Sequence, residues 1–194
     1  MKRLFIILIL FSSISIKAQW VQTNGPNGGV VKSFAISGTN IFAGTYNGVY
    51  LSTNNGTSWT AVNNGLTNLD VWSLAVSGTN IFAGTGDGVF KSTNNGTSWT
   101  AVNNGLTSSG VYALAVSGTN IFAGTYNYPT GYGVFKSTNN GASWTAVNNG
   151  LTNLSVFSLA VSGTNIFAGT LYNGVFLSTN NGASWTAINN GLTN

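Results

Sequence analysis

Residues 77–85 read Ser-Gly-Thr-Asn-Ile-Phe-Ala-Gly-Thr, and the same segment recurs without change at 37–45, 117–125 and 162–170. A valine lies six residues before each copy. Successive valines are 40, 40 and 45 residues apart, at Val31, Val71, Val111 and Val156. Periods of this length are typical of proteins that repeat one small supersecondary unit and stack the copies on one another.

Each repeat contains four short segments with the composition of β-strands. In the second repeat, residues 71–77 alternate large and small side chains, and residues 81–85 follow after a tight turn. Residues 89–93 come after Gly-Asp-Gly, which supplies the positive φ angles of a hairpin turn, and residues 98–102 end the unit. We name the four predicted strands A, B, C and D in chain order.

Four short strands in a unit of this length predict an all-β propeller made of four-stranded antiparallel blades. The predicted blades occupy residues 31–70, 71–110, 111–155 and 156–194. A β-solenoid is the structural alternative, but its rungs are usually shorter than this repeat.

The turn between strands C and D carries a more specific pattern. In the first repeat it reads Ser-Thr-Asn-Asn-Gly-Thr-Ser-Trp at residues 52–59, and it returns in every repeat. It resembles the Asp-box, or BNR, repeat of sialidases, sortilin-type receptors, xyloglucan-active glycosidases and photosystem II assembly factors. Asn stands where that family usually has Asp, and its side-chain carbonyl can still accept backbone N–H bonds.

The resemblance implies that this turn lies in an outer hairpin and marks the fold rather than a site. The glycine permits a positive φ, and the tryptophan offers apolar area for packing. The residues to which we assign this structural role are Ser52, Asn54, Gly56, Trp59, Ser92, Asn94, Gly96, Trp99, Ser137, Asn139, Gly141, Trp144, Ser178, Asn180, Gly182 and Trp185.

The beginning of the chain reads as a secretory signal peptide over residues 1–18, with a basic start and a short apolar run. We therefore expect export to the periplasm, the cell surface or the medium, with no membrane span after signal removal. Residues 19–30 follow as an N-terminal segment in which Trp20 to Gly25 resemble strand D and its connection. Because the last repeat has its own strand D, we expect an incomplete ring that needs further blades or self-assembly.

Composition excludes several classes of function. The 194 residues include no His and no Cys, and charged residues make up only 4%. After residue 18, three lysines face two aspartates, which leaves a net charge of +1. A nearly neutral chain has no electrostatic footprint for nucleic acid. We expect no metal and no cofactor, since the usual ligand and nucleophile residues are missing.

Length variation among the repeats falls on the turn between strands B and C. This turn and the connection from strand D to the next strand A should share one face, and insertions often mark the binding face of repeat proteins. Tyrosines there suit contact with a sugar or a protein surface. We therefore predict a non-catalytic binding or scaffolding role toward a protein or polysaccharide, through Tyr46, Tyr126, Tyr128, Tyr132 and Tyr172.

Two alternatives remain open at this point. Several of the resembled families cleave glycosidic bonds, which needs two carboxylates, and Asp70 and Asp87 fall on the same predicted face. Their counterparts in other repeats are ordinary turn residues, and the resembled arginine cluster of sialidases has no match after residue 18. The other alternative is a purely architectural surface repeat, which the near-identity of the four copies would fit.

Overall fold

The computed structural model describes residues 25–26 and 29–192, and within them the chain forms four antiparallel sheets of four strands each. The all-β propeller prediction is confirmed by these sheets. Blade 1 holds β1 (Val31–Ser37), β2 (Asn40–Thr45), β3 (Gly48–Ser52) and β4 (Thr60–Ala61), and blade 2 holds β5 (Val71–Ser77), β6 (Asn80–Thr85), β7 (Gly88–Ser92) and β8 (Thr100–Ala101). Blade 3 holds β9 (Val111–Ser117), β10 (Asn120–Asn127), β11 (Thr130–Ser137) and β12 (Thr145–Ala146), and blade 4 holds β13 (Val156–Ser162), β14 (Asn165–Thr170), β15 (Gly174–Ser178) and β16 (Thr186–Ala187).

The predicted signal segment and most of residues 19–30 lie outside the described residues. No helix in the described part of the chain is long and apolar enough to cross a membrane.

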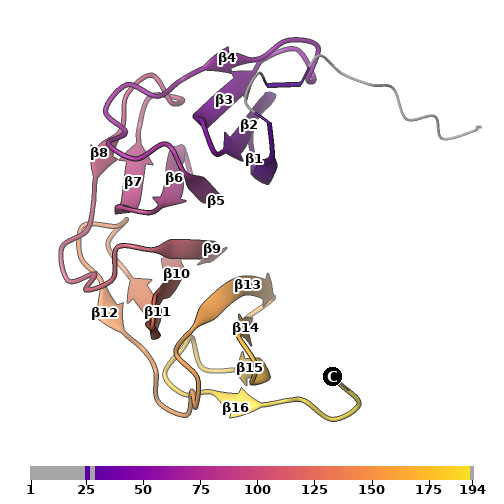
Figure 1. Ribbon diagram of the computed structural model, residues 1–194, viewed down its shortest axis with the longest axis vertical. Coiled ribbons are helices and arrows are strands. Elements are labelled where there is room, and N and C mark those ends of the chain that lie inside the picture. Colours follow the sequence, from indigo (N-terminus) through magenta and orange to yellow (C-terminus); the bar gives the residue numbers. More distant parts are fainter. Residues whose placement is uncertain (1–24, 27–28, 193–194) are drawn as a thin grey trace, which may run out of the picture.

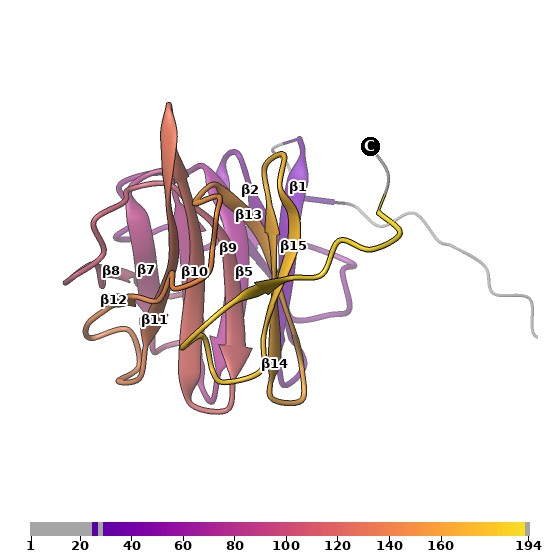
Figure 2. The same cartoon turned by 90° about the horizontal axis from the view of Figure 1, so that it is seen from below.

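Strand A agrees with the prediction, but two other elements differ from it. Strand D was expected over about five residues, yet only two residues of each outer strand pair with strand C, as Thr100 and Ala101 do in β8. The preceding tryptophan instead turns its backbone N–H toward the neighbouring blade. The insertion of the third repeat falls between strands B and C, as predicted, but it lengthens β10 and β11 into a longer hairpin rather than a loop, with Asn127 paired to Thr130. Figure 2 shows this hairpin rising above the other turns.

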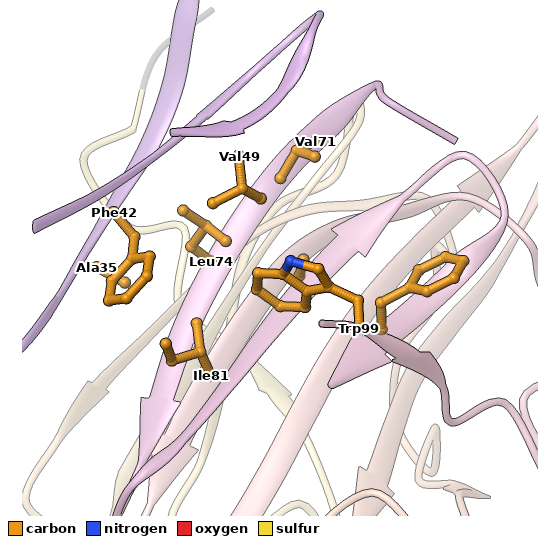
Figure 3. Packing of buried hydrophobic residues seen from close by; sticks show 9 residues of the cluster. Ala35, Phe42, Val49, Val71, Leu74, Ile81 and Trp99 are labelled. Carbon is orange, nitrogen blue, oxygen red and sulfur yellow. The ribbon is translucent and has the colours of Figure 1, made fainter. Parts of the chain in front are cut away.

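The core of the molecule lies between blades rather than within one sheet. Ala35, Phe42 and Val49 of blade 1 pack against Leu74 and other apolar residues of blade 2, including Ile81, Phe90 and Trp99 (Figure 3). Equivalent clusters join blade 2 to blade 3 and blade 3 to blade 4. Because one kind of interface is used three times, each repeat carries two different apolar faces, one for each neighbour.

Figure 1 shows the four blades arranged along an arc, with the innermost strands β1, β5, β9 and β13 on its concave side. The tight turns between strands B and C lie beside the connections that enter the next strand A. Backbone hydrogen bonds fix this arrangement, since Gly48 donates to Leu69 at 2.8 Å and Gly133 donates to Leu154 at 2.7 Å. This end of the blades carries the candidate site.

Candidate functional site

Every innermost strand begins with a β-bulge that releases its second residue from the sheet. In blade 2, Val71 lies opposite Thr85 and Ser73 opposite Gly84, so Trp72 is the extra residue between them. The same register shift occurs in the other three blades. Bulges re-aim side chains and are frequent beside functional sites. The released residues are Lys32, Trp72, Tyr112 and Phe157.

Three of these four residues are aromatic, and they contact one another from blade to blade. The rings of Trp72 and Tyr112 are stacked, with centroids 4.1 Å apart and planes inclined by 16°. Tyr112 lies 4.8 Å from Phe157 between ring centroids, and Tyr126 from the adjacent B–C end lies 5.0 Å from Phe157. We call Trp72, Tyr112, Tyr126 and Phe157 the aromatic row.

The aromatic row borders a shallow hollow of about 530 Å³. Lys32, Tyr46 and Asp70 provide its polar edge, while Trp72, Tyr112 and Phe157 provide its apolar part. The ammonium group of Lys32 lies 4.4 Å from the centroid of the Tyr46 ring, a cation–π distance. The hollow thus combines flat apolar rings with one cation, one carboxylate and phenol groups, a set suited to an uncharged ligand rich in hydroxyls.

Partial burial in this row affects the ionisation of Tyr112. Desolvation raises the pKa of its phenol above the ordinary value, and the neighbouring Tyr126 and Asp70 raise it further. The phenol therefore stays neutral at physiological pH. It can both donate and accept a hydrogen bond at the edge of the row.

The structure divides the tyrosines predicted from the sequence into two groups. Tyr46 borders the hollow and Tyr126 belongs to the aromatic row. Tyr128 and Tyr172 project into solvent with 84% and 88% of their surface exposed, and Tyr132 is 41% exposed. The last three lie on the same end of the blades but make no ring contact with the row among the described residues.

The two candidate carboxylates differ in their surroundings. Asp70 borders the hollow, and its backbone N–H donates to Asn68 Oδ1 at 2.8 Å. Asp87 accepts bonds from Thr67 Oγ1 at 3.1 Å and from Asn68 Nδ2 at 3.3 Å.

Asn173, the counterpart of Asp87 in blade 4, makes the same kind of contacts with Thr152 and Asn153. The side chain at this position therefore fastens the B–C turn to the preceding connection, and a carboxylate is not needed for that task.

The C–D turns form a repeated side-chain network. Ser92 Oγ accepts the N–H of Gly96 at 2.9 Å and donates to Asn94 Oδ1 at 2.9 Å. Asn94 Oδ1 also accepts the N–H of Ser98 at 2.9 Å. Blades 1, 3 and 4 repeat this network through Asn54, Asn139 and Asn180. These side chains are used within the turn, which agrees with a structural role.

The bulge residues were not among the sites predicted from the sequence. A signal was nevertheless present, because the residue after Val31, Val71, Val111 and Val156 is Lys, Trp, Tyr or Phe in repeats that otherwise hardly differ. In any single repeat, a large aromatic residue on an alternating strand is interpreted as a core residue. The bulge that turns them outward becomes visible only in the register of β1 with β2 and its equivalents.

Comparison with solved structures supports the propeller fold. The chain resembles an ancestral GH74 enzyme with a TM-score of 0.70 and 28% sequence identity, over 87% of this chain and 25% of that one. It resembles the extracellular domain of BT4673 from B. thetaiotaomicron with a TM-score of 0.69 and 23% identity, over 88% of this chain and 23% of that one. The GH74 xyloglucanase from Xanthomonas campestris follows with a TM-score of 0.64 and 17% identity, over 87% and 31%.

These matches span a quarter to a third of the other chains. No protein-family model matches the sequence, and no curated protein matches it either.

Proposed function

We propose that this chain is an exported, non-catalytic propeller of the Asp-box type that binds a polysaccharide along the aromatic row. The observation that carries the proposal is the set of bulges that place Trp72, Tyr112 and Phe157 side by side at one end of the blades. Three exposed or half-buried rings that contact one another indicate a binding surface more strongly than one isolated surface aromatic does.

The chemistry of the row fits a sugar chain better than a charged partner. A pyranose presents an apolar face that can lie on an aromatic ring, while its hydroxyls need donors and acceptors at the edge. Lys32, Tyr46 and Asp70 are placed to supply them. The small net charge after residue 18 leaves little electrostatic attraction for an anionic polymer.

The comparisons add support of a general kind. Two of the similar structures are GH74 enzymes, and one of them is a xyloglucanase. The match to an extracellular domain agrees with export, as does the apparent signal peptide. The network at the C–D turns is the argument for the Asp-box assignment, since Asn fulfils the acceptor role of the usual Asp.

Glycosidase activity is the second candidate function, because Asp70 borders the same hollow. Hydrolysis by acid and base or nucleophile needs a second carboxylate a few ångströms away. Asp87 is the other carboxylate of the chain, and its oxygens are engaged in fastening a turn. Binding without cleavage is therefore the function that these residues support better.

The proposal predicts that Trp72→Ala weakens binding of soluble xyloglucan at least about tenfold, which is about 1.4 kcal/mol. Isothermal titration calorimetry on the exported chain measures the affinity, and Tyr128→Ala is the matched control because Tyr128 is exposed but outside the row. Equal loss in both variants, or none in either, would sink the proposal. Release of reducing ends that disappears in Asp70→Asn would favour the glycosidase instead.

A further inference from the structure

At one end of the arc, the described residues supply no acceptor for an indole donor that is hydrogen-bonded in the other three blades. Trp99, Trp144 and Trp185 each donate their indole Nε1–H at 2.7 Å to a backbone carbonyl of the preceding blade, at Val62, Val102 and Val147. Their counterpart in blade 1 is Trp59, whose buried Nε1 has no partner among the described residues. A buried donor without an acceptor costs roughly 1–3 kcal/mol.

The backbone repeats the same pattern. The N–H groups of Trp99, Trp144 and Trp185 donate at 2.8–2.9 Å to the carbonyls of Asn64, Asn104 and Asn149 in the preceding blade. At the other end of the arc, the equivalent carbonyls belong to Ile188 and Asn190. Among the described residues, neither of these carbonyls is seen to accept such a bond. One end of the molecule therefore offers backbone acceptors of the kind that the Trp59 indole lacks at the other end.

Apolar side chains follow the same division. On blade 1, Phe34 and Ile36 are 60% and 66% exposed, whereas their counterparts Leu74 and Val76 in blade 2 lie in or against the first core cluster. We call Phe34, Ile36 and Trp59 the head face.

On blade 4, Leu192 is 60% exposed and Ile188 is 40% exposed, although their counterparts Leu66 and Val62 pack against Trp99 and its neighbours. Phe167 and Val175 are half-buried there, while the equivalent Phe42 and Val49 are fully buried. We call Phe167, Val175, Ile188 and Leu192 the tail face.

We propose that the head face docks on the tail face of a second copy of this chain. The two faces are the two halves of the interface that already joins blades 1 to 2, 2 to 3 and 3 to 4, so the partner with matching shape and donors is the chain itself. The exposed side chains of β1 need the inner strands of a whole blade to cover them. A single added outer strand would not reach them.

Figure 1 shows that the head and tail faces of one copy lie at opposite ends of the arc, so one chain does not join them to each other. Two copies can satisfy both faces if each head meets the other tail around a two-fold axis. Such a ring holds eight blades, within the range of known propellers. A head-to-tail contact of this kind is heterologous and closes only when the rotation fits.

The docking would also add a cation at the Phe157 end of the aromatic row. Phe157 lies on the last innermost strand, β13, and the next bulge position in such a ring is the partner's Lys32. A second copy would then place a cation beside the exposed end of the row, as Lys32 lies beside Tyr46 in the single chain.

Light scattering coupled to size exclusion on the exported chain tests the proposal. The expected mass is twice that of one chain, and Ile36→Glu or Leu192→Glu should each halve it. Both side chains are exposed in the single chain, so neither substitution should impair folding, which circular dichroism can check. Thr100→Glu, an exposed position on β8 away from both faces, is the matched control and should keep the double mass.

Mixing the two variants gives the sharper result. Ile36→Glu spoils a head but leaves its tail intact, and Leu192→Glu does the reverse, so the mixture should form a one-to-one pair through the single intact contact. A single-chain mass for the unmodified protein at high concentration would overturn the proposal. So would a mixture in which the folded variants stay apart, or an unmodified assembly larger than two copies.

Discussion

At the scale of single residues, the β-bulge decides whether a large apolar side chain of an innermost strand is buried between blades or turned out of the sheet. Leu74 and Leu114 lie two residues after the bulge residues Trp72 and Tyr112, a spacing that would put both on one face of an unbroken strand, and they are buried between blades. Trp72 and Tyr112, two positions earlier, are turned out of the sheet by the bulge and contact each other instead. An alternating pattern could predict the first group from the sequence but not the second.

The half-buried phenol of Tyr112 in the aromatic row leads to a prediction about pH. Because burial raises the pKa of Tyr112, its neutral form stabilises the fold fully below the ordinary tyrosine pKa of about 10. That contribution is lost as the pH rises through the raised pKa of the folded state. Urea unfolding at increasing alkaline pH should therefore show a smaller loss of stability in Tyr112→Phe than in the unmodified chain. Identical pH profiles would contradict this assignment.

The indole donors give a second residue-scale prediction. Trp144→Phe keeps most of the apolar area but leaves the carbonyl of Val102 without its 2.7 Å bond. We expect the free energy of unfolding to fall by about 1–3 kcal/mol. Trp59→Phe is the matched control when both substitutions are compared in the Ile36→Glu background, because Trp59 Nε1 then has no partner among the described residues to lose, and a larger loss there than at Trp144 would be the contrary result.

At the scale of elements, the turns were predictable and the outer strands were not. Strand A and the hairpin turns follow from alternation and from glycines, and they were placed within a residue or so. The outer strands pair over only two residues because the residues around them serve the next blade, as Trp99 N–H does with Asn64. A contact between repeats leaves no periodic signal inside one repeat.

The connection after the outer strand offers a test of this packing between elements. Gly105 has φ +81°, and a Cβ there would meet the carbonyl oxygen of Trp144 in the next blade. Gly105→Ala should cost about 3 kcal/mol, from the strained φ and the collision together. Gly118→Ala shares the positive φ but meets open space, so it should cost about 1 kcal/mol. Equal losses in thermal or urea unfolding would show that the neighbouring blade does not constrain the connection.

At the scale of the whole molecule, the repeat predicted both the blades and an incomplete ring, and the arc in Figure 1 agrees with that expectation. The binding face was predicted at the end of the blades with the B–C turns, and the aromatic row lies at that end, but the binding role itself stays a prediction. What the sequence did not reveal is that the rings on neighbouring blades come together, because residues 40 and 45 positions apart meet only after the blades have stacked.

The central claim is that the aromatic row holds a sugar chain, and a crystal structure of residues 19–194 with a xyloglucan oligosaccharide tests it most directly. The account predicts that sugar rings lie on Trp72 and Tyr112, with hydroxyls reaching Lys32, Tyr46 or Asp70. An oligosaccharide bound elsewhere, or a row left empty at saturating ligand, would contradict it.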